Sequence, residues 1–362
     1  MSLSPSRKRL LKRLVLGGIS LGFVVATFAY FLPTIANYGQ VWEVVKGLSW
    51  PWIAALLGAV VLNLVTFAPP WQVALPGLSF VQALTVTQAS TALSIVVPAG
   101  IAAGVAGSVA VLRSWGFGAR EIGRAVTLTG LWNQFLNLSF PIVAVFLLTI
   151  QGEQTAALAT VAFVGVAILG ILVAGFVLVL VSGRLAHEMG DVAARVSNWG
   201  LRLIRRGPVS WNGTSFGRFR EEAGDLLERR WHVLTLTSLA GSLTVFVVLL
   251  VTLRAVGVPA SQVDATEAFA SWALVRLLGS VPITPGGVGV IELGLTGALV
   301  GFGGANARVV AAVLVYRVLT TVPTLLLGLA AAATFRRRRR LPPADAAPPV
   351  PAGISPVRDD AQ

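Results

Sequence analysis

The sequence predicts an all-α polytopic membrane protein, with six transmembrane helices and two re-entrant helical hairpins arranged as an inverted repeat. Three observations lead to this fold class. First, 55% of the 362 residues are hydrophobic and 12% are charged, about half the charged fraction of a typical soluble domain. Second, several apolar segments reach the roughly 20 residues needed to cross a bilayer. Third, two further apolar segments are each interrupted in the middle by Pro and Gly.

The six predicted spans are the uninterrupted apolar segments. They cover approximately residues 14–32, 51–67, 125–150, 156–181, 232–252 and 308–334. The first one follows a basic N-terminal segment, residues 1–13, as the apolar part of a signal peptide would. It is long for such a peptide and no convincing small-x-small cleavage site follows it, so we interpret it as an uncleaved span.

The two interrupted segments cover residues 82–112, with VVPAGIAAG around Pro98, and residues 268–301, with PITPGGVG around Pro285. Each is either one kinked span or a pair of half-helices that returns to the side it came from. Cytoplasmic loops retain Lys and Arg, and this rule separates the two possibilities. Re-entrant hairpins place most of the 28 basic residues on one side, whereas full spans would move the arginine-rich residues 182–231 to the other side. We therefore predict hairpins.

The order span, span, hairpin, span occurs twice, in residues 14–150 and again in residues 156–334. The first unit starts inside and the second starts outside, so the units are inverted, which is typical of transporters with a site near the midplane. Irregular backbone at membrane depth must be buried in protein or line a wet cavity. We therefore expect the two breaks to meet inside one transmembrane domain, residues 14–335.

Two segments outside the spans explain much of the net charge of +13. Within residues 182–231, apolar residues from Leu185 to Leu203 follow a three-and-four spacing with arginines between them, which predicts an amphipathic helix on the cytoplasmic surface. Residues 336–362 begin with RRRRR and continue as a Pro- and Ala-rich segment. We interpret them as a lipid anchor followed by a disordered cytoplasmic tail, and we expect no nucleic-acid partner.

The chain contains no Cys and 2 His. Thiolate chemistry, disulfides and a multi-histidine metal site are therefore excluded as mechanisms. We expect no cofactor and no metal.

Three ionisable residues lie where the sequence predicts hydrocarbon: Arg276, Glu292 and Arg317. Each costs about 2.5–3.5 kcal/mol when it is unpaired at the centre of a spanning helix, so a partner or an aqueous path is expected. Arg317 follows Arg308 by about 14 Å along a helix and lies close to mid-depth. Glu292 follows Gly287 within the first turns of the half-helix after the break, where the helix terminus is electropositive.

These three charges leave two interpretations open. In the structural one, Glu292 pairs with Arg276 or Arg317 and holds the second hairpin to the last span. In the functional one, two arginines against one glutamate, beside a helix N-terminus, form a site for a phosphate-bearing headgroup. Residues 80–112, which include the first hairpin, contain no charged residue. The polar side chains of this hairpin are therefore hydroxyls and amides.

With these residues in view, the chain resembles the flippase-like transmembrane domain family, which is fused to lysylphosphatidylglycerol synthases and is also found alone. The resemblance covers roughly residues 10–335. It rests on PITPGGVGVIE, which is similar to the family motif Pro-Gly-Gly-x-Gly-x-x-Glu, on Arg276 upstream of it, on YRVLTTVP in the last span and on VVPAG in the first hairpin.

The resemblance implies translocation of lipids with anionic or aminoacylated phosphate headgroups across a bacterial cytoplasmic membrane. The distribution of Lys and Arg separately predicts that both termini are cytoplasmic. Only a short tail follows the last span, so we expect a stand-alone member without the synthase domain, and no enzymatic activity. The substrate-binding residues that it implies are Arg276, Pro285, Gly286, Gly287, Gly289, Glu292 and Arg317, with Pro98 and Gly100 in the first hairpin.

Two other functional classes fit the same pattern. A transporter of a small anionic solute would also use an inverted repeat and charges at the midplane. A non-transporting membrane protein could instead scaffold an envelope-lipid biosynthetic enzyme. The expected partners are therefore membrane lipids with an anionic or phosphate headgroup and, in addition, such an enzyme.

Overall fold

The structure is a computed structural model that describes residues 42–43, 46–96, 100–152, 156–203, 213–279 and 285–338. All regular secondary structure in these ranges is helical. The basic N-terminus, the predicted first span, Pro98 and the tail beyond residue 338 lie outside the described residues.

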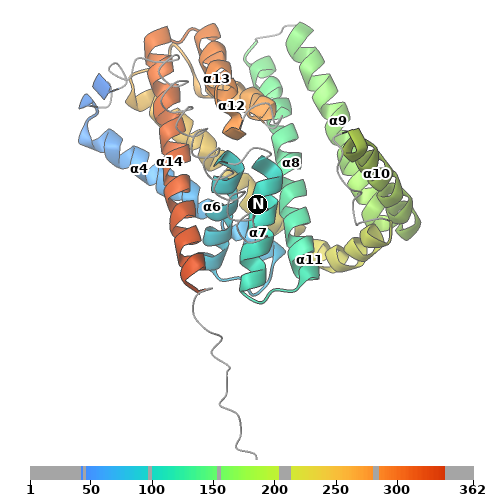
Figure 1. Cartoon of the computed structure of the whole chain (residues 1–362). Coiled ribbons are helices and arrows are strands. Elements are labelled where there is room, and N and C mark those ends of the chain that lie inside the picture. Colours follow the sequence, from blue (N-terminus) through green and yellow to red (C-terminus); the bar gives the residue numbers. More distant parts are fainter. Residues whose placement is uncertain are drawn as a thin grey trace, which may run out of the picture.

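Long helices cross the described part of the molecule from end to end, and shorter helices lie between them (Figure 1). In chain order the helices are α4 (Trp50–Thr66), α5 (Pro69–Ala74), α6 (Phe80–Val96), α7 (Gly100–Ser114), α8 (Ala119–Ile150), α9 (Ala156–Val181), α10 (Gly183–Leu203), α11 (Gly213–Ala255), α12 (Ala265–Gly279), the 3₁₀ turn η2 (Pro285–Gly287), α13 (Val290–Gly301) and α14 (Asn306–Arg338).

The described residues contain four helical segments long and apolar enough to cross a membrane, namely Trp50–Ala74, Ala119–Ile150, Leu227–Ala255 and Asn306–Ala331. A fifth candidate is the pair formed by α9 and α10, which is bent by 112° between Val166–Leu178 and Gly183–Val192. The protein is therefore an all-helical polytopic membrane protein, as predicted.

The connection predicted over residues 182–231 differs from the structure in its second half. Its first half forms α10, where the apolar periodicity predicted a helix. Its second half is continuous with the next span, because α11 begins at Gly213 and runs for 43 residues. The sequence REEAGDLLERR is rich in strong helix formers and contains no proline, so nothing ends the helix at the membrane surface.

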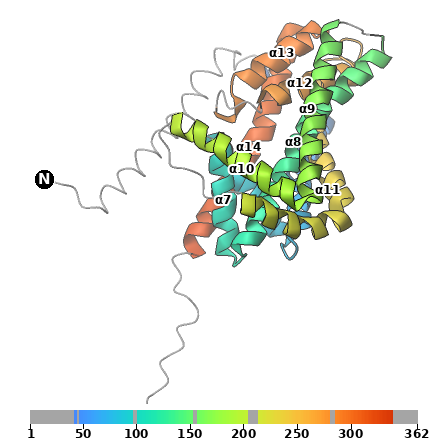
Figure 2. The same cartoon turned by 90° about the vertical axis from the view of Figure 1, so that its right-hand side faces the viewer.

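Two pairs of short helices lie one above the other along the long axis of the molecule. α6 and α7 lie against each other in the lower half of Figure 1, and α12 and α13 lie against each other in the upper half. Figure 2 likewise shows α7 in the lower half and α12 and α13 in the upper half. The second break, η2, packs against α6. A Cβ added to Gly286 of η2 would lie 3.2 Å from Cγ2 of Ile95 in α6. The second break therefore lies against the end of α6. Residues 97–99 of the first break lie outside the described residues, so the meeting of the two breaks stays a prediction.

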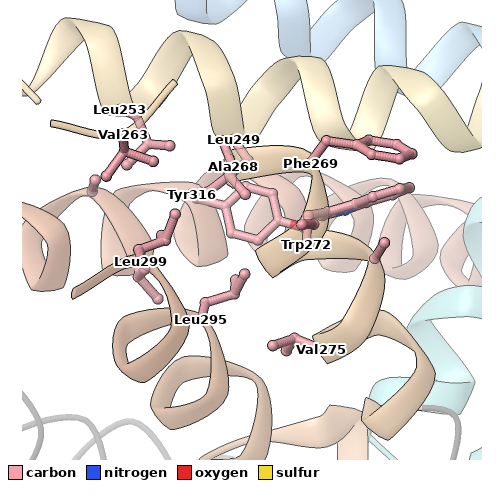
Figure 3. Close-up of a cluster of buried hydrophobic side chains, with 14 of the residues drawn as sticks. Leu249, Leu253, Val263, Ala268, Phe269, Trp272, Val275, Leu295, Leu299 and Tyr316 are labelled. Carbon is pink, nitrogen blue, oxygen red and sulfur yellow. The ribbon is translucent and has the colours of Figure 1, made fainter. Parts of the chain in front are cut away.

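Each pair of short helices packs into its own apolar core. The lower core includes Leu112 of α7 and Leu128 of α8, which are both fully buried. The upper core joins α11, α12, α13 and α14. There the ring of Tyr316 lies among the side chains of Leu249, Leu295 and Trp272 (Figure 3).

Small residues allow the helices to approach closely, as is common in membrane bundles. A Cβ added to Gly100 or Gly104 of α7 would overlap Ser94 of α6, and one added to Gly328 of α14 would overlap Ala92 of α6. These contacts fix α6 between α7 and α14.

Candidate functional site

The break in the second helix pair is built from glycines in the left-handed region. Gly286, Gly287 and Gly289 have φ of 63°, 66° and 84°, a conformation that costs other residues roughly 1–2 kcal/mol. η2 begins at Pro285, and Gly289 is the N-cap of α13. Because the backbone reverses here at mid-height, its peptide groups need partners from side chains.

Glu292 supplies one of these partners. Its Oε2 accepts a hydrogen bond from the backbone N–H of Gly289 at 2.7 Å. This contact satisfies one of the free donors at the N-terminus of α13, where a negative charge also interacts favourably with the helix dipole. Glu292 is 2% exposed, so the carboxylate is held deep in the protein.

Arg317 of α14 ties both sides of the break together. Its Nε donates to Oε1 of Glu292 at 2.6 Å, and its Nη2 donates to the carbonyl oxygen of Gly286 at 3.0 Å. The Arg317 side chain is 17% exposed and that of Glu292 is 3% exposed. Of the two partners left open by the sequence, the structure thus selects Arg317 for Glu292.

Arg276 is held by a different set of groups. Its Nε donates to Oδ1 of Asn137 in α8 at 2.6 Å, and its Nη2 makes a long 3.5 Å contact with Oδ1 of Asn133. The guanidinium also lies over the ring of Trp272, with 5.2 Å between its central carbon and the ring centroid, a cation–π geometry. These contacts orient the charge through neutral partners.

Both arginines line one cavity of about 300 Å³, which we call the guanidinium cavity. Arg276 and Arg317 are the only Lys, Arg, Asp or Glu side chains among the described residues that line it. Around them lie amide and hydroxyl groups from α4, α6, α8 and α14: Asn63, Thr87, Gln88, Thr91, Asn137, Tyr316, Thr320, Thr321 and Thr324. Glu292 pairs with Arg317, so the described residues place two guanidinium groups and one carboxylate at this cavity.

The structure brings together most of the residues implied by the sequence. Arg317 donates hydrogen bonds to both Glu292 and Gly286. Arg276 lines the same cavity as Arg317. Gly100 is not among the residues that line it; its lack of a side chain serves the close approach of α7 to Ser94 instead.

The threonines of α14 and Asn63 of α4 were not predicted from the sequence. Thr320, Thr321 and Thr324 follow Arg317 at helical three-and-four spacing, which places them on one face with it, so periodicity could have found them. Asn63 carries no such signal, because its 3.2 Å hydrogen bond to Thr244 of α11 joins residues far apart in the chain.

Fold and site together define a polytopic helical membrane protein with a buried guanidinium–carboxylate pair at a backbone break. The chain belongs to the lysylphosphatidylglycerol synthase transmembrane region family, whose family model matches residues 16–328. A comparison with curated proteins gave no match.

Proposed function

We propose that the protein translocates a lipid with an anionic, phosphate-bearing headgroup, which binds in the guanidinium cavity. The observation that carries this proposal is the pair Arg276 and Arg317 on one cavity of about 300 Å³, beside a broken helix. Guanidinium groups bind phosphate oxygens through strong charge-assisted hydrogen bonds. The family to which the chain belongs, by the resemblance described above, supports lipid rather than solute as the substrate.

Charge balance supports an anionic ligand. Glu292 has both carboxylate oxygens engaged, one by Gly289 and one by Arg317, so it is committed to the break. Arg276 is oriented in part by the amide oxygens of Asn137 and Asn133. A phosphate in the cavity would lie beside two guanidinium groups, which bind anionic oxygens through charge-assisted hydrogen bonds.

The proposed architecture is the one that alternating access requires. Six spans and two re-entrant hairpins would form an inverted repeat, with α6–α7 entering from one side and α12–α13 from the other. Such repeats let one central site open to either face. The membrane would be the bacterial cytoplasmic membrane with both termini cytoplasmic, the protein would not be an enzyme, and an envelope-lipid biosynthetic enzyme would supply or receive the lipid.

The test uses the full chain in vesicles, with fluorescent phospholipids and a membrane-impermeant quencher. Arg276→Gln is the primary variant, because Arg276 lines the cavity and donates to the neutral amides of Asn133 and Asn137. Arg308→Gln is the matched control, because Arg308 also donates to a neutral group, the carbonyl oxygen of Gly257, at the far end of α14. The parent should move anionic lipids faster than empty vesicles do, and Arg276→Gln should slow this movement at least tenfold while Arg308→Gln keeps it.

A second variant tests Arg317 without leaving a buried charge. Arg317→Gln alone would strand Glu292, whereas Glu292→Gln/Arg317→Gln removes both charges together. The double variant should also slow anionic lipid movement. Lipid movement no faster than in empty vesicles, across anionic, zwitterionic and polyprenyl-phosphate lipids, would refute the proposal. Uptake of inorganic phosphate in place of lipid movement would identify a small-anion transporter.

A further inference from the structure

A second cavity, of about 290 Å³, adjoins the guanidinium cavity and differs from it in chemistry. The two cavities share Phe67, Thr87 and Thr91, so α6 borders both. They are also linked through Asn133, which lines the second cavity and accepts the long contact from Arg276. We call the second one the hydroxyl cavity, because six Ser and Thr residues of α6, α7 and α8 line it together with Ser238 and Ser242 of α11.

No charged side chain is among the described residues that line the hydroxyl cavity. Several of its hydroxyl groups already donate their own proton to a helix carbonyl. Ser90 donates to Thr87 at 3.0 Å, Ser94 to Ser90 at 3.0 Å and Thr129 to Ala125 at 2.8 Å. A hydroxyl group has one proton and two lone pairs. These groups therefore present mainly acceptors to whatever occupies the cavity.

This acceptor-rich, uncharged wall discriminates between headgroup chemistries. A phosphodiester offers only hydrogen-bond acceptors, so it binds better to the guanidinium donors of the arginines than to this wall. An ammonium group offers donors, but the described walls provide no carboxylate for it, and burying a charge without a partner is costly. The guanidinium of Arg276, which reaches Asn133 of this wall, adds repulsion. A neutral hydroxylated group supplies donors without a charge, and its C–H faces match the apolar walls of Trp71 and Val105.

We propose that the substrate is a lipid phosphodiester whose phosphate carries an uncharged polyhydroxyl group, glycerol or a sugar, and that this group occupies the hydroxyl cavity while the phosphate contacts the arginines. The inference rests on the proposed function, because it places the phosphate in the guanidinium cavity. It adds a selectivity that the arginines alone cannot provide, since they hold any phosphate equally.

Binding of four lipids to the full chain in detergent, measured by native mass spectrometry, tests the selectivity. Phosphatidylethanol is the matched reference, because it has the same single negative charge as phosphatidylglycerol and no hydroxyl group. Phosphatidylglycerol, phosphatidylinositol or both should bind about fivefold to tenfold more tightly than phosphatidylethanol, the gain expected from one or two net hydrogen bonds. Phosphatidylethanolamine should bind more weakly than all three. The better of the first two identifies glycerol or a sugar as the preferred group.

The matched variants are Ser90→Ala/Thr129→Val inside the cavity and Ser139→Ala/Thr149→Val outside both cavities. All four hydroxyls donate to a carbonyl of the preceding helical turn, those of Ser139 and Thr149 at 2.7 and 2.8 Å, so helix effects are balanced. The first pair should reduce the preference for hydroxylated lipids to less than about twofold, while phosphatidylethanol binds as in the parent. The second pair should keep the full preference.

The possible outcomes separate this inference from the proposed function. Equal binding of phosphatidylglycerol, phosphatidylinositol and phosphatidylethanol to the parent overturns the inference, and tighter binding of phosphatidylethanolamine overturns it in favour of an ammonium site. Arg276→Gln should weaken the binding of all three anionic lipids to the same extent. If it does so while no hydroxyl preference exists, only the inference fails; if it changes none of them, the phosphate site fails as well.

Discussion

Glu292→Gln should destabilise the protein because it removes the charge that compensates Arg317. The side-chain oxygen of a glutamine can accept a hydrogen bond from either Gly289 or Arg317. Its NH₂ group, which is itself a donor, then faces the other of these two donors. Removing one partner of a fully buried ion pair costs about 3–5 kcal/mol. The Arg317 side chain is 17% exposed and faces a cavity, so part of its charge is hydrated after the change. We therefore expect a smaller loss than this range, about 2–3 kcal/mol.

Glu121→Gln provides the matched control. Glu121 also accepts a hydrogen bond from a glycine at the N-cap of its helix, Gly118 of α8, at 2.9 Å, but it lies at the exposed end of the molecule. Its replacement should cost about 0.5–1 kcal/mol, the value of an exposed cap and its helix-dipole contact. The difference between the two variants therefore measures the ion pair and not the cap.

The assay is thermal unfolding of the purified protein in detergent, with and without phosphatidylglycerol. The melting temperature of Glu292→Gln should fall by about 5 °C relative to the parent, that of Glu121→Gln by about 1–2 °C. The double variant Glu292→Gln/Arg317→Gln should be more stable than Glu292→Gln, because it no longer leaves an uncompensated charge. Equal losses for Glu292→Gln and Glu121→Gln would refute the reasoning.

Three further predictions follow from the packing and the topology. Gly286→Ala should cost about 1–2 kcal/mol of stability, because an alanine must adopt φ near 63° against α6, and Gly297→Ala on the open face of α13 is the control. Gly328→Ala should cost about 1–3 kcal/mol by pressing α14 against Ala92; a loss no larger than that of Gly297→Ala would argue against this tight contact. Ala305→Cys, in the cysteine-free chain, should react with a membrane-impermeant maleimide added to the outside of intact cells; labelling from the cytoplasmic side only would contradict a re-entrant second hairpin.

The sequence by itself determines most of the spanning helices and the second break. Hydropathy places a span at residues 156–181, and the structure has α9 at Ala156–Val181; the last predicted span, residues 308–334, lies within α14. The physical reason is that lipid offers no hydrogen bonds, so an apolar segment of this length has no alternative to a helix. The glycines after Pro285 also mark the second break, because their left-handed backbone is unfavourable for other residues.

Only the tertiary structure decides which charges meet and which hydroxyls form a wall. From the sequence alone, either Arg276 or Arg317 could pair with Glu292. The pair forms with Arg317 because α13 packs on α14, whereas α12 turns Arg276 toward the asparagines of α8. The hydroxyl cavity likewise joins α6, α7, α8 and α11. Such contacts depend on how helices distant in sequence pack against one another, and hydropathy, which depends only on neighbours along the chain, carries no record of that packing.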